Sequence, residues 1–339
     1  MARKLLGAVL VAAAVLAGSW FMAEQWAADR AREIIAQHPD LQAADVGPLR
    51  QPGRVGLRLD EPGLRLPEMS LHAAGLELWL PFWRPLTGVA APAAEGWLEL
   101  AGQRLSYRQE QAQARVRLSP LAGFVLASLR LESGAVMLDG RALLDRLAFD
   151  VARAGMDLAP EGAGAAYDLT LRLERLQPQA LPSSPAMPVA IPDLSARGQG
   201  RLWLDRALAP DQRHAVQVVG LQAGSLQLDL GNGLTARLVG RLVRGAGGLT
   251  EGRVALYTDD SRGFLDAAIE TGLIEGNVRL LAEAMLKRVS ALPMPAPAHA
   301  DGLDFPPAAP GETRIPLVLR DGRLFLGDMP LGPAPVFPG

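Results

Sequence analysis

Apolar and polar residues alternate along most of the chain. In residues 54–60 (RVGLRLD), 168–176 (DLTLRLERL) and 225–231 (SLQLDLG), leucine or valine returns at every second position. A period of two predicts β-strands with one apolar and one polar face. Strands of this kind are typical of antiparallel sheets that leave one face in water. We therefore expect a mainly β fold, built as an antiparallel curled sheet that forms a groove or a sandwich.

A short phrase, glycine followed by Leu or Val and then Leu at alternate positions, recurs more often than the composition explains. It begins at Gly53, Gly96, Gly134, Gly200, Gly224, Gly252, Gly276 and Gly322. We interpret the phrase as a strand entered from a turn, so that its repetition predicts a series of similar hairpins. Asp139-Gly140, Gly231-Asn232-Gly233 and Asp321-Gly322 are predicted turns, because Gly, Asn and Asp accept positive φ readily.

Helical spacing appears late in the chain. Apolar residues from Val278 to Val289 recur every three or four positions, so the phrase at Gly276 belongs to a helix. Upstream, Asp259 or Asp260 is a candidate N-cap and Gly272 a candidate stop for a shorter helix. The sequence thus predicts two helices near residues 260–291.

The N-terminus resembles an export signal. Arg3 and Lys4 precede an almost wholly apolar run from Leu5 to Met22. Its length and the tryptophans near its end favour a signal-anchor that stays in the membrane, although Ala17-Gly18-Ser19 would also suit cleavage. The residues expected inside the membrane include Leu5, Leu10, Leu16 and Phe21.

This anchor predicts the location of the protein. Positive charge before the helix keeps the N-terminus cytoplasmic, so we expect a single-pass protein of the bacterial inner membrane with most of the chain in the periplasm. The helix continues from Trp26 to His38-Pro39, and we expect this part either to form a short stalk or to pack on the first sheet.

Two proline-rich segments punctuate the rest of the chain. The first suggests a division into a signal-anchor and stalk (1–38), an N-terminal β region (39–178), a linker (179–192) and a C-terminal β region with two inserted helices (193–339). The second, between Pro293 and Pro310, delays the closing hairpin. Residues 313–326 are therefore expected to return and pair with a distant strand.

Composition excludes several classes of function. The chain has no cysteine and a formal net charge of −2, which argues against thiolate chemistry and nucleic-acid binding. His38, His72, His214 and His299 lack metal-ligand spacing, and no nucleotide-binding or nucleophile motif occurs. Asp259 and Asp260 could share a proton or hold a cation, but helix capping explains them better. We predict a protein that is not an enzyme and has no cofactor or metal site.

The densest aromatic stretch holds Trp79, Phe82 and Trp83, together with Pro81 and Pro85. Proline places such a stretch at a sheet edge or in a loop. These side chains either form an exposed patch that contacts lipid, membrane or a partner, or they fill the core at the end of the sheet.

Several segments resemble a known family. The N-terminal signal-anchor and residues 76–92, 96–108, 257–286 and 315–335 together resemble an uncharacterised bacterial family of membrane-anchored periplasmic proteins, a domain of unknown function. That family is distantly similar to the AsmA and TamB group of envelope proteins. The resemblance implies a curled sheet with an apolar lining, used to handle lipid or in envelope biogenesis, and it implies no active-site residue.

Together these observations predict a membrane-anchored, non-enzymatic envelope protein that binds lipid in an apolar β-groove. The alternative is an anchored scaffold that binds another envelope protein through its sheet edges or its aromatic loop.

Overall fold

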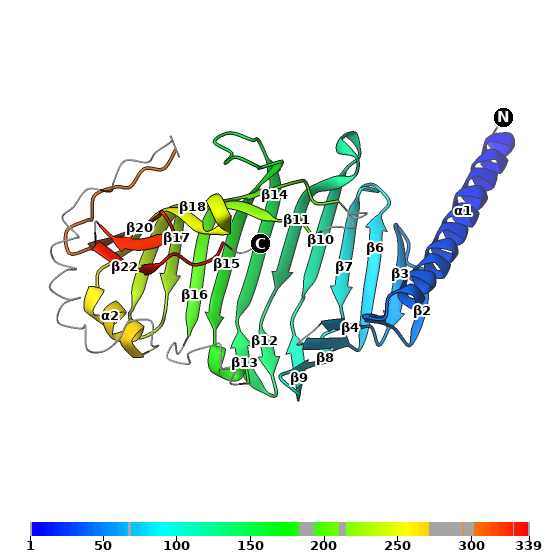
Figure 1. Ribbon diagram of the computed structural model, residues 1–339. Coiled ribbons are helices and arrows are strands. Elements are labelled where there is room, and N and C mark those ends of the chain that lie inside the picture. Colours follow the sequence, from blue (N-terminus) through cyan, green and yellow to red (C-terminus); the bar gives the residue numbers. More distant parts are fainter. Residues whose placement is uncertain are drawn as a thin grey trace. The chain divides into compact units, whose positions relative to one another are not determined.

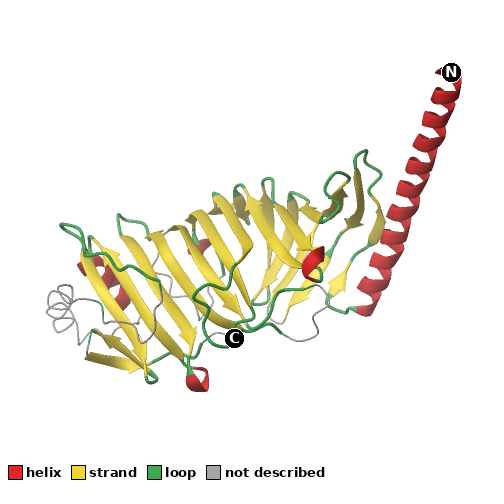
Figure 2. Ribbon diagram, turned by 90° about the horizontal axis from the view of Figure 1, so that it is seen from above, coloured by secondary structure: helices red, strands yellow, loops and turns green. Residues whose placement is uncertain are grey.

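The protein is mainly β, as the alternation predicts (Figure 1). The computed structural model describes residues 2–66, 69–182, 193–209, 215–270, 294, 302–327 and 329–337. Strands dominate, and the long N-terminal helix and a few short helical segments accompany them (Figure 2). The strand pairs in the described part of the chain are antiparallel, and its sheets do not close on themselves.

The elements follow one another in this order: α1 (Ala2–Gln37), β1 (Leu41–Gln42), β2 (Asp45–Pro48), β3 (Arg54–Asp60), β4 (Gly63–Leu66), β5 (Met69–Ala73), β6 (Gly75–Pro81), β7 (Thr87–Pro92), β8 (Glu95–Leu100), β9 (Gln103–Gln109), β10 (Gln113–Ser119), β11 (Val125–Ser133), β12 (Val136–Leu138), β13 (Arg141–Leu144), β14 (Arg146–Ala154), β15 (Ala165–Leu176), β16 (Leu194–Leu204), β17 (Val218–Asp229), β18 (Thr235–Arg244), β19 (Thr250–Thr258), α2 (Ser261–Glu270), β20 (Thr313–Arg320), β21 (Arg323–Leu326) and β22 (Met329–Pro333). Single 3-10 turns occur at Pro120–Ala122, Pro178–Ala180 and Ala246–Gly248.

The chain forms two compact units. The first holds residues 1–118 and 131–141, and the second holds residues 119–130 and 142–339. The strands on either side of the proline-rich segment at 179–192, β15 and β16, pair with each other inside the second unit. These units thus divide the chain at a different place from the predicted linker, whose residues 183–192 lie outside the described part. The predicted four-part division stays a prediction.

In the first unit, pairs of strands alternate between two sheets. One sheet contains the run β2-β3-β6-β7-β10, and the other contains β1-β4-β5-β8-β9-β12. The chain passes from one sheet to the other at short corners, such as Glu61, whose φ is 47°, and Gln111, whose φ is 51°. Backbone hydrogen bonds continue across these corners, from Ala74 to Glu95 and from Ala93 to Gly75. Backbone hydrogen bonding therefore continues between the two sheets at their shared corners.

In the second unit, strands that follow one another in sequence lie side by side, from β14 to β22. β20 pairs with β19 although the chain between them contains α2 and more than forty further residues, from 271 to 312. This pairing confirms that residues 313–326 return to a distant strand. The hairpin between β20 and β21 turns at Asp321 and Gly322, both of positive φ, and the predicted turns at Asp139-Gly140 and Gly231-Asn232-Gly233 are also confirmed.

The recurrent glycines have a second use that the sequence pattern does not reveal. Gly200, Gly224 and Gly252 lie inside strands, not at their starts. A Cβ added at Gly200 would come within 2.6 Å of the Gln222 carbonyl oxygen, and at Gly252 within 2.0 Å of the Arg241 carbonyl oxygen. Adjacent strands approach closely here, which is one of the reasons for glycine inside a strand. The phrase at Gly276 and the second predicted helix lie outside the described residues.

The first of the two late helices is confirmed. α2 begins after Asp260, whose carboxylate accepts a hydrogen bond from the Gly263 backbone N–H at 2.8 Å. This is the contact of an N-cap, so the capping interpretation of Asp260 is correct. Asp259 instead accepts a hydrogen bond from the Thr235 hydroxyl at 3.3 Å.

The C-terminal half of α1 packs on the first unit, which decides between the stalk and the packed segment. Ala28 is fully buried against Val46 and Leu59. Glu24 is also fully buried, and its carboxylate accepts hydrogen bonds from the backbone N–H groups of Arg50 at 3.2 Å and Gly56 at 3.1 Å.

No helix in the described part of the chain is both long enough and apolar enough to cross a membrane. The membrane-spanning role of Leu5, Leu10, Leu16 and Phe21 stays a prediction. All four residues lie in α1, and the side chains of the first three are outside the described part.

Replacing Glu24 should destabilise the first unit strongly. Glu24→Ala leaves the buried Gly56 N–H and the partly buried Arg50 N–H without their charged acceptor, and we expect a loss of about 3 kcal/mol in the free energy of unfolding. Urea unfolding of the full chain in detergent, followed by circular dichroism, measures this loss. Glu33→Ala is the matched control because Glu33 is exposed on the same helix and pairs only with Arg30, so it should cost less than about 1 kcal/mol. Equal costs would contradict a structural role for Glu24.

Candidate functional site

The most extensive candidate surface is the apolar face of the second unit's sheet. Strand register places Leu171, Gly198, Leu226, Leu238, Leu256 and Ile315 side by side across β15 to β20. Leu169 and Leu173 lie on the same face of β15, and Leu228 lies on the same face of β17 because Leu173 and Leu228 are both opposite Ala196. This set, which we call the apolar face, has no charged member.

Side chains of the apolar face are only half-buried. The closed cluster at the other end of β15, formed by Val151, Ala165, Tyr167 and Leu204 with Leu169 at its margin, differs, since Tyr167 has no exposed surface at all. Neighbouring side chains on one sheet shield each other only partly from solvent where no second layer covers them. The face is therefore available for contact with an apolar ligand.

Small residues form the centre of the apolar face, which is therefore shallower than the leucines around it. Gly200, Ala223 and Gly240 lie opposite one another on β16, β17 and β18. An added Cβ at Gly240 would lie 2.8 Å from a side-chain carbon of Val254 and 2.9 Å from the Arg253 carbonyl oxygen. Larger side chains are thus excluded at Gly200 and Gly240, and leucines border a shallow apolar strip.

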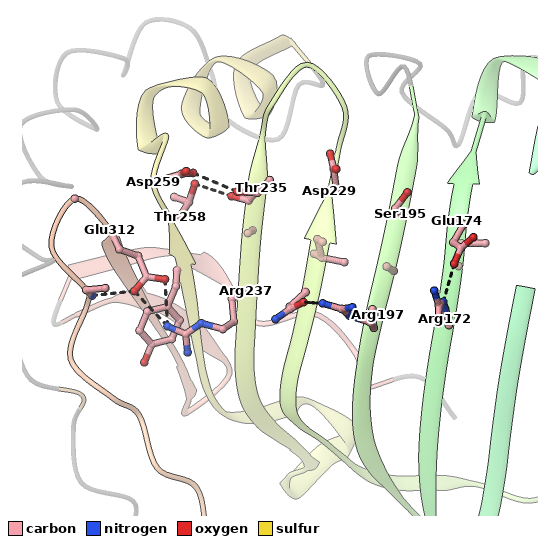
Figure 3. Close-up of a pocket in the computed structure, with 18 of the residues that line it drawn as sticks. Arg172, Glu174, Ser195, Arg197, Asp229, Thr235, Arg237, Thr258, Asp259 and Glu312 are labelled. Carbon is pink, nitrogen blue, oxygen red and sulfur yellow. Dashed lines mark hydrogen bonds and ion pairs between the residues drawn. The ribbon is translucent and has the colours of Figure 1, made fainter. Parts of the chain in front are cut away.

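The opposite, polar face of the same strands contains a pocket of about 650 Å³ (Figure 3). Arg172, Arg197, Gln227, Arg237 and Tyr257 follow one another across β15 to β19 in direct register. Residues 309–312 complete the lining.

Each arginine of this pocket has a partner. Arg172 pairs with Glu174 at 2.6 Å, and Arg197 donates to the Gln227 amide oxygen at 2.6 Å. Arg237 binds both carboxylate oxygens of Glu312, at 3.1 and 3.2 Å, and its guanidinium carbon lies 3.9 Å from the centre of the Tyr257 ring. Figure 3 shows the Arg172 and Arg237 pairs.

These contacts fasten the chain that precedes β20 to the sheet. The Tyr257 hydroxyl donates to the Pro306 carbonyl at 2.9 Å, and burial raises the pKa of Tyr257 above its ordinary value of 10.0. Val239, Ala255 and Tyr257 are buried beneath Met294, Leu303 and Phe305. The pocket therefore holds a proline-rich segment in place, and its polar groups are satisfied by one another.

Neither the pocket nor the histidines show a metal site. The described residues contain no group of three His, Asp or Glu side chains that could hold a metal ion. His38 contacts the Ile34 carbonyl oxygen at 2.8 Å, whereas His72 stacks on Trp97 with ring centres 3.7 Å apart. His214 and His299 lie outside the described residues.

The aromatic stretch divides into two environments. Trp79 is half-buried on β6 with Arg54 above its ring, at 4.7 Å from the centre. Phe82 and Trp83, in the loop between β6 and β7, are 68% and 73% exposed. The core-filling interpretation is thus wrong for Phe82 and Trp83, and their contact with lipid or a partner stays a prediction.

Comparison with known proteins identifies the family. The model of the family described as "Uncharacterized protein conserved in bacteria (DUF2125)" matches residues 22–335. The chain belongs to this family. The match to the DUF2125 model includes all the strands described above. Comparisons with curated proteins and with solved structures found no match to the chain.

Sequence reasoning found the apolar face but missed the arginine row. Alternation placed Leu171 and Leu228 on apolar strand faces before their register was known. The arginines stand 25 to 40 residues apart in the sequence, from Arg172 to Arg197 and from Arg197 to Arg237, so only the strand register brings them together.

His72 should make the first unit sensitive to acid. Burial, followed by the charges of Arg104 and Arg65, lowers the pKa of His72 below its ordinary value of 6.5. The unfolded chain therefore binds a proton at a higher pH than the folded chain, and the stability contributed by neutral His72 is lost as the pH falls below 6.5.

Urea unfolding midpoints at about pH 7.5 and pH 5 measure this effect. His72→Phe keeps an aromatic ring against Trp97 but cannot titrate, so its midpoint should fall less on acidification than that of the unsubstituted protein. An equal fall in both proteins would show that His72 does not contribute.

Proposed function

We propose that this protein is a membrane-anchored, non-enzymatic protein of the bacterial cell envelope, with its β region in the periplasm, and that the apolar face binds lipid acyl chains. The observation that carries the proposal is the unbroken row of aliphatic and glycine residues across β15 to β20. The resemblance of the chain to the AsmA and TamB group of envelope proteins also supports lipid binding.

Physical chemistry favours an acyl chain over a peptide as the ligand of this face. An acyl chain has no polar groups, so it can lie on aliphatic side chains without losing hydrogen bonds. A peptide would bring backbone N–H and C=O groups that need partners. The central strip of Gly200, Ala223 and Gly240 also suits a narrow, flexible chain better than a side chain of fixed shape.

Anchoring is supported by the sequence of α1. Arg3 and Lys4 precede the apolar run from Leu5 to Met22, and this order of charges favours export of the remaining chain. A lipid-binding sheet held at the membrane would lie close to its source of ligand.

The alternative function is an anchored scaffold that binds another envelope protein. At one edge of the sheet in the second unit, binding of a partner by addition of a strand is unfavourable. β22 carries Pro330 and Pro333, which cannot donate backbone hydrogen bonds to a new strand. The exposed Phe82 and Trp83 remain the better contact for a protein partner.

A photoactivatable phospholipid with a diazirine in its acyl chain tests the proposal directly. Full-length protein in detergent should become labelled on peptides that contain Leu171, Leu226 or Leu228, as read by mass spectrometry. Leu171→Asp and Leu228→Asp should each lower this labelling at least about tenfold, because a carboxylate in an apolar contact is costly.

Matched controls are the neighbouring residues on the polar face. Thr170→Asp and Gln227→Asp change the same strands by one position and should leave labelling unchanged. Since the leucines are half-buried, their replacement should also preserve the circular dichroism spectrum. Unfolding of both leucine variants would indicate that these leucines lie in a closed core. Equal photolabelling of all four variants and the unsubstituted protein would favour the alternative function as a scaffold.

A further inference from the structure

One end of the first unit brings three separate segments together. The register of β3 and β6 places Arg54 opposite Pro81, so the loop before β3 and the loop after β6 lie at the same end. The Phe82 N–H donates to the Gly53 carbonyl oxygen at 3.1 Å. A Cβ added at Gly53 would lie 3.4 Å from a ring carbon of Trp83, so the indole lies directly against this loop.

Helix α1 reaches the same end. The Arg50 guanidinium lies 4.2 Å from the centre of the Phe21 ring and donates to the Phe21 carbonyl oxygen at 3.4 Å. Arg32, further along the helix, donates to the carbonyl oxygen of Val46, near the start of β2. The helix therefore runs opposite to β2, and its residues before Phe21 continue past the loops.

Large apolar side chains are exposed at this end. Phe21, Met22, Phe82, Trp83 and Leu86 are between 41% and 75% exposed. Residues 49–54 and 81–87 contain three arginines, Arg50, Arg54 and Arg84, and no acidic residue, and Arg50 pairs with the buried Glu24 of α1 at 3.7 Å. We call the exposed set of Phe21, Met22, Phe82, Trp83, Arg84 and Leu86 the rim.

We propose that the rim docks on the surface of a bilayer that contains anionic lipids, so that the first unit lies against the membrane. Aromatic side chains with arginine are typical of the membrane–water interface, where rings lie among the headgroups and cations meet phosphates. Arginines without any carboxylate in these two loops match a negative surface.

Continuity with the apolar N-terminal run distinguishes a bilayer from a protein partner. Phe21 and Met22 are both members of the rim and the last residues of the run from Leu5 to Met22. Helical rise places Leu5 about 24 Å beyond Phe21, which is most of the thickness of a hydrocarbon core. A helix that enters a bilayer at this point holds the rim close to the surface, where Phe82 and Trp83 can insert among the headgroups.

The inference rests on the anchoring part of the proposed function but not on lipid binding by the apolar face. The chain has no cysteine, so a single introduced cysteine carries a single label. Leu86→Cys places an environment-sensitive fluorophore in the rim and leaves Phe82 and Trp83 in place. Ala74→Cys is the control, because Ala74 is exposed at the opposite end of β6.

Full-length protein is reconstituted into vesicles of phosphatidylcholine with or without phosphatidylglycerol, some with nitroxide-labelled headgroups as quenchers. The label at Leu86→Cys should shift its emission to the blue and be quenched, whereas the label at Ala74→Cys should not. Replacing both Phe82 and Trp83 by Ser should abolish the shift at position 86. Equal behaviour of the two labels, or a shift that survives the double replacement, would overturn the proposal.

Arg84→Gln tests the contribution of charge. Arg84 is exposed, so its replacement should preserve the fold and lower the equilibrium constant for docking on anionic vesicles about fivefold, with little change on neutral ones. An unchanged preference for anionic vesicles would overturn the electrostatic part.

The same vesicles separate failure of docking from failure of anchoring. An unanchored protein would not float with vesicles in a density gradient. An anchored protein that does not dock would float, and the fluorophores at positions 86 and 74 would show the same emission and quenching. Photolabelling of the apolar face is measured in detergent and depends on neither result.

Discussion

The alternating strands of this protein have one apolar face each, and the rest of the structure depends on how these apolar faces are covered. A sheet that does not close cannot bury all of them against itself, so each region must cover its apolar residues in another way. In the first unit, α1 covers Val46 and Leu59. Along β18 and β19, Met294, Leu303 and Phe305 cover the other face, where Val239, Ala255 and Tyr257 lie. The apolar face around Leu226 is left half-buried, which is why it is the candidate for a lipid.

Polar groups maintain this open arrangement where apolar packing is thin. Gln109 is buried at a corner of the first unit and bonds to the carbonyls of Pro92 and Ala93, while its own carbonyl accepts from the Ala112 N–H. Arg237 and Glu312 have a similar role in the second unit, where they fix the segment before β20. Satisfied buried polar groups specify one geometry, because any shift would leave a donor or acceptor unpaired.

The sequence was sufficient to predict features that depend on neighbouring residues. The alternation of Leu169, Leu171 and Leu173, the turn at Asp321-Gly322 and the cap at Asp260 each need only a few consecutive positions. The return of residues 313–326 to a distant strand could also be predicted from the long proline-rich interval, although the identity of that strand, β19, could not. What could not be predicted depends on register. The arginine row, the folded corners at Glu61 and Gln111, and the central position of Gly200 within β16 all require knowledge of which residues face each other across strands.

The buried carboxylate of Glu24 has a consequence for how the protein would respond to its surroundings. This carboxylate binds the backbone of both the loop between β2 and β3, at Arg50, and β3 itself, at Gly56, so it ties the helix to the first strands. In the membrane-anchored protein that we propose, a tilt of α1 would move the first strands with it, and bilayer thickness, which influences the tilt of a spanning helix, would act on the sheet.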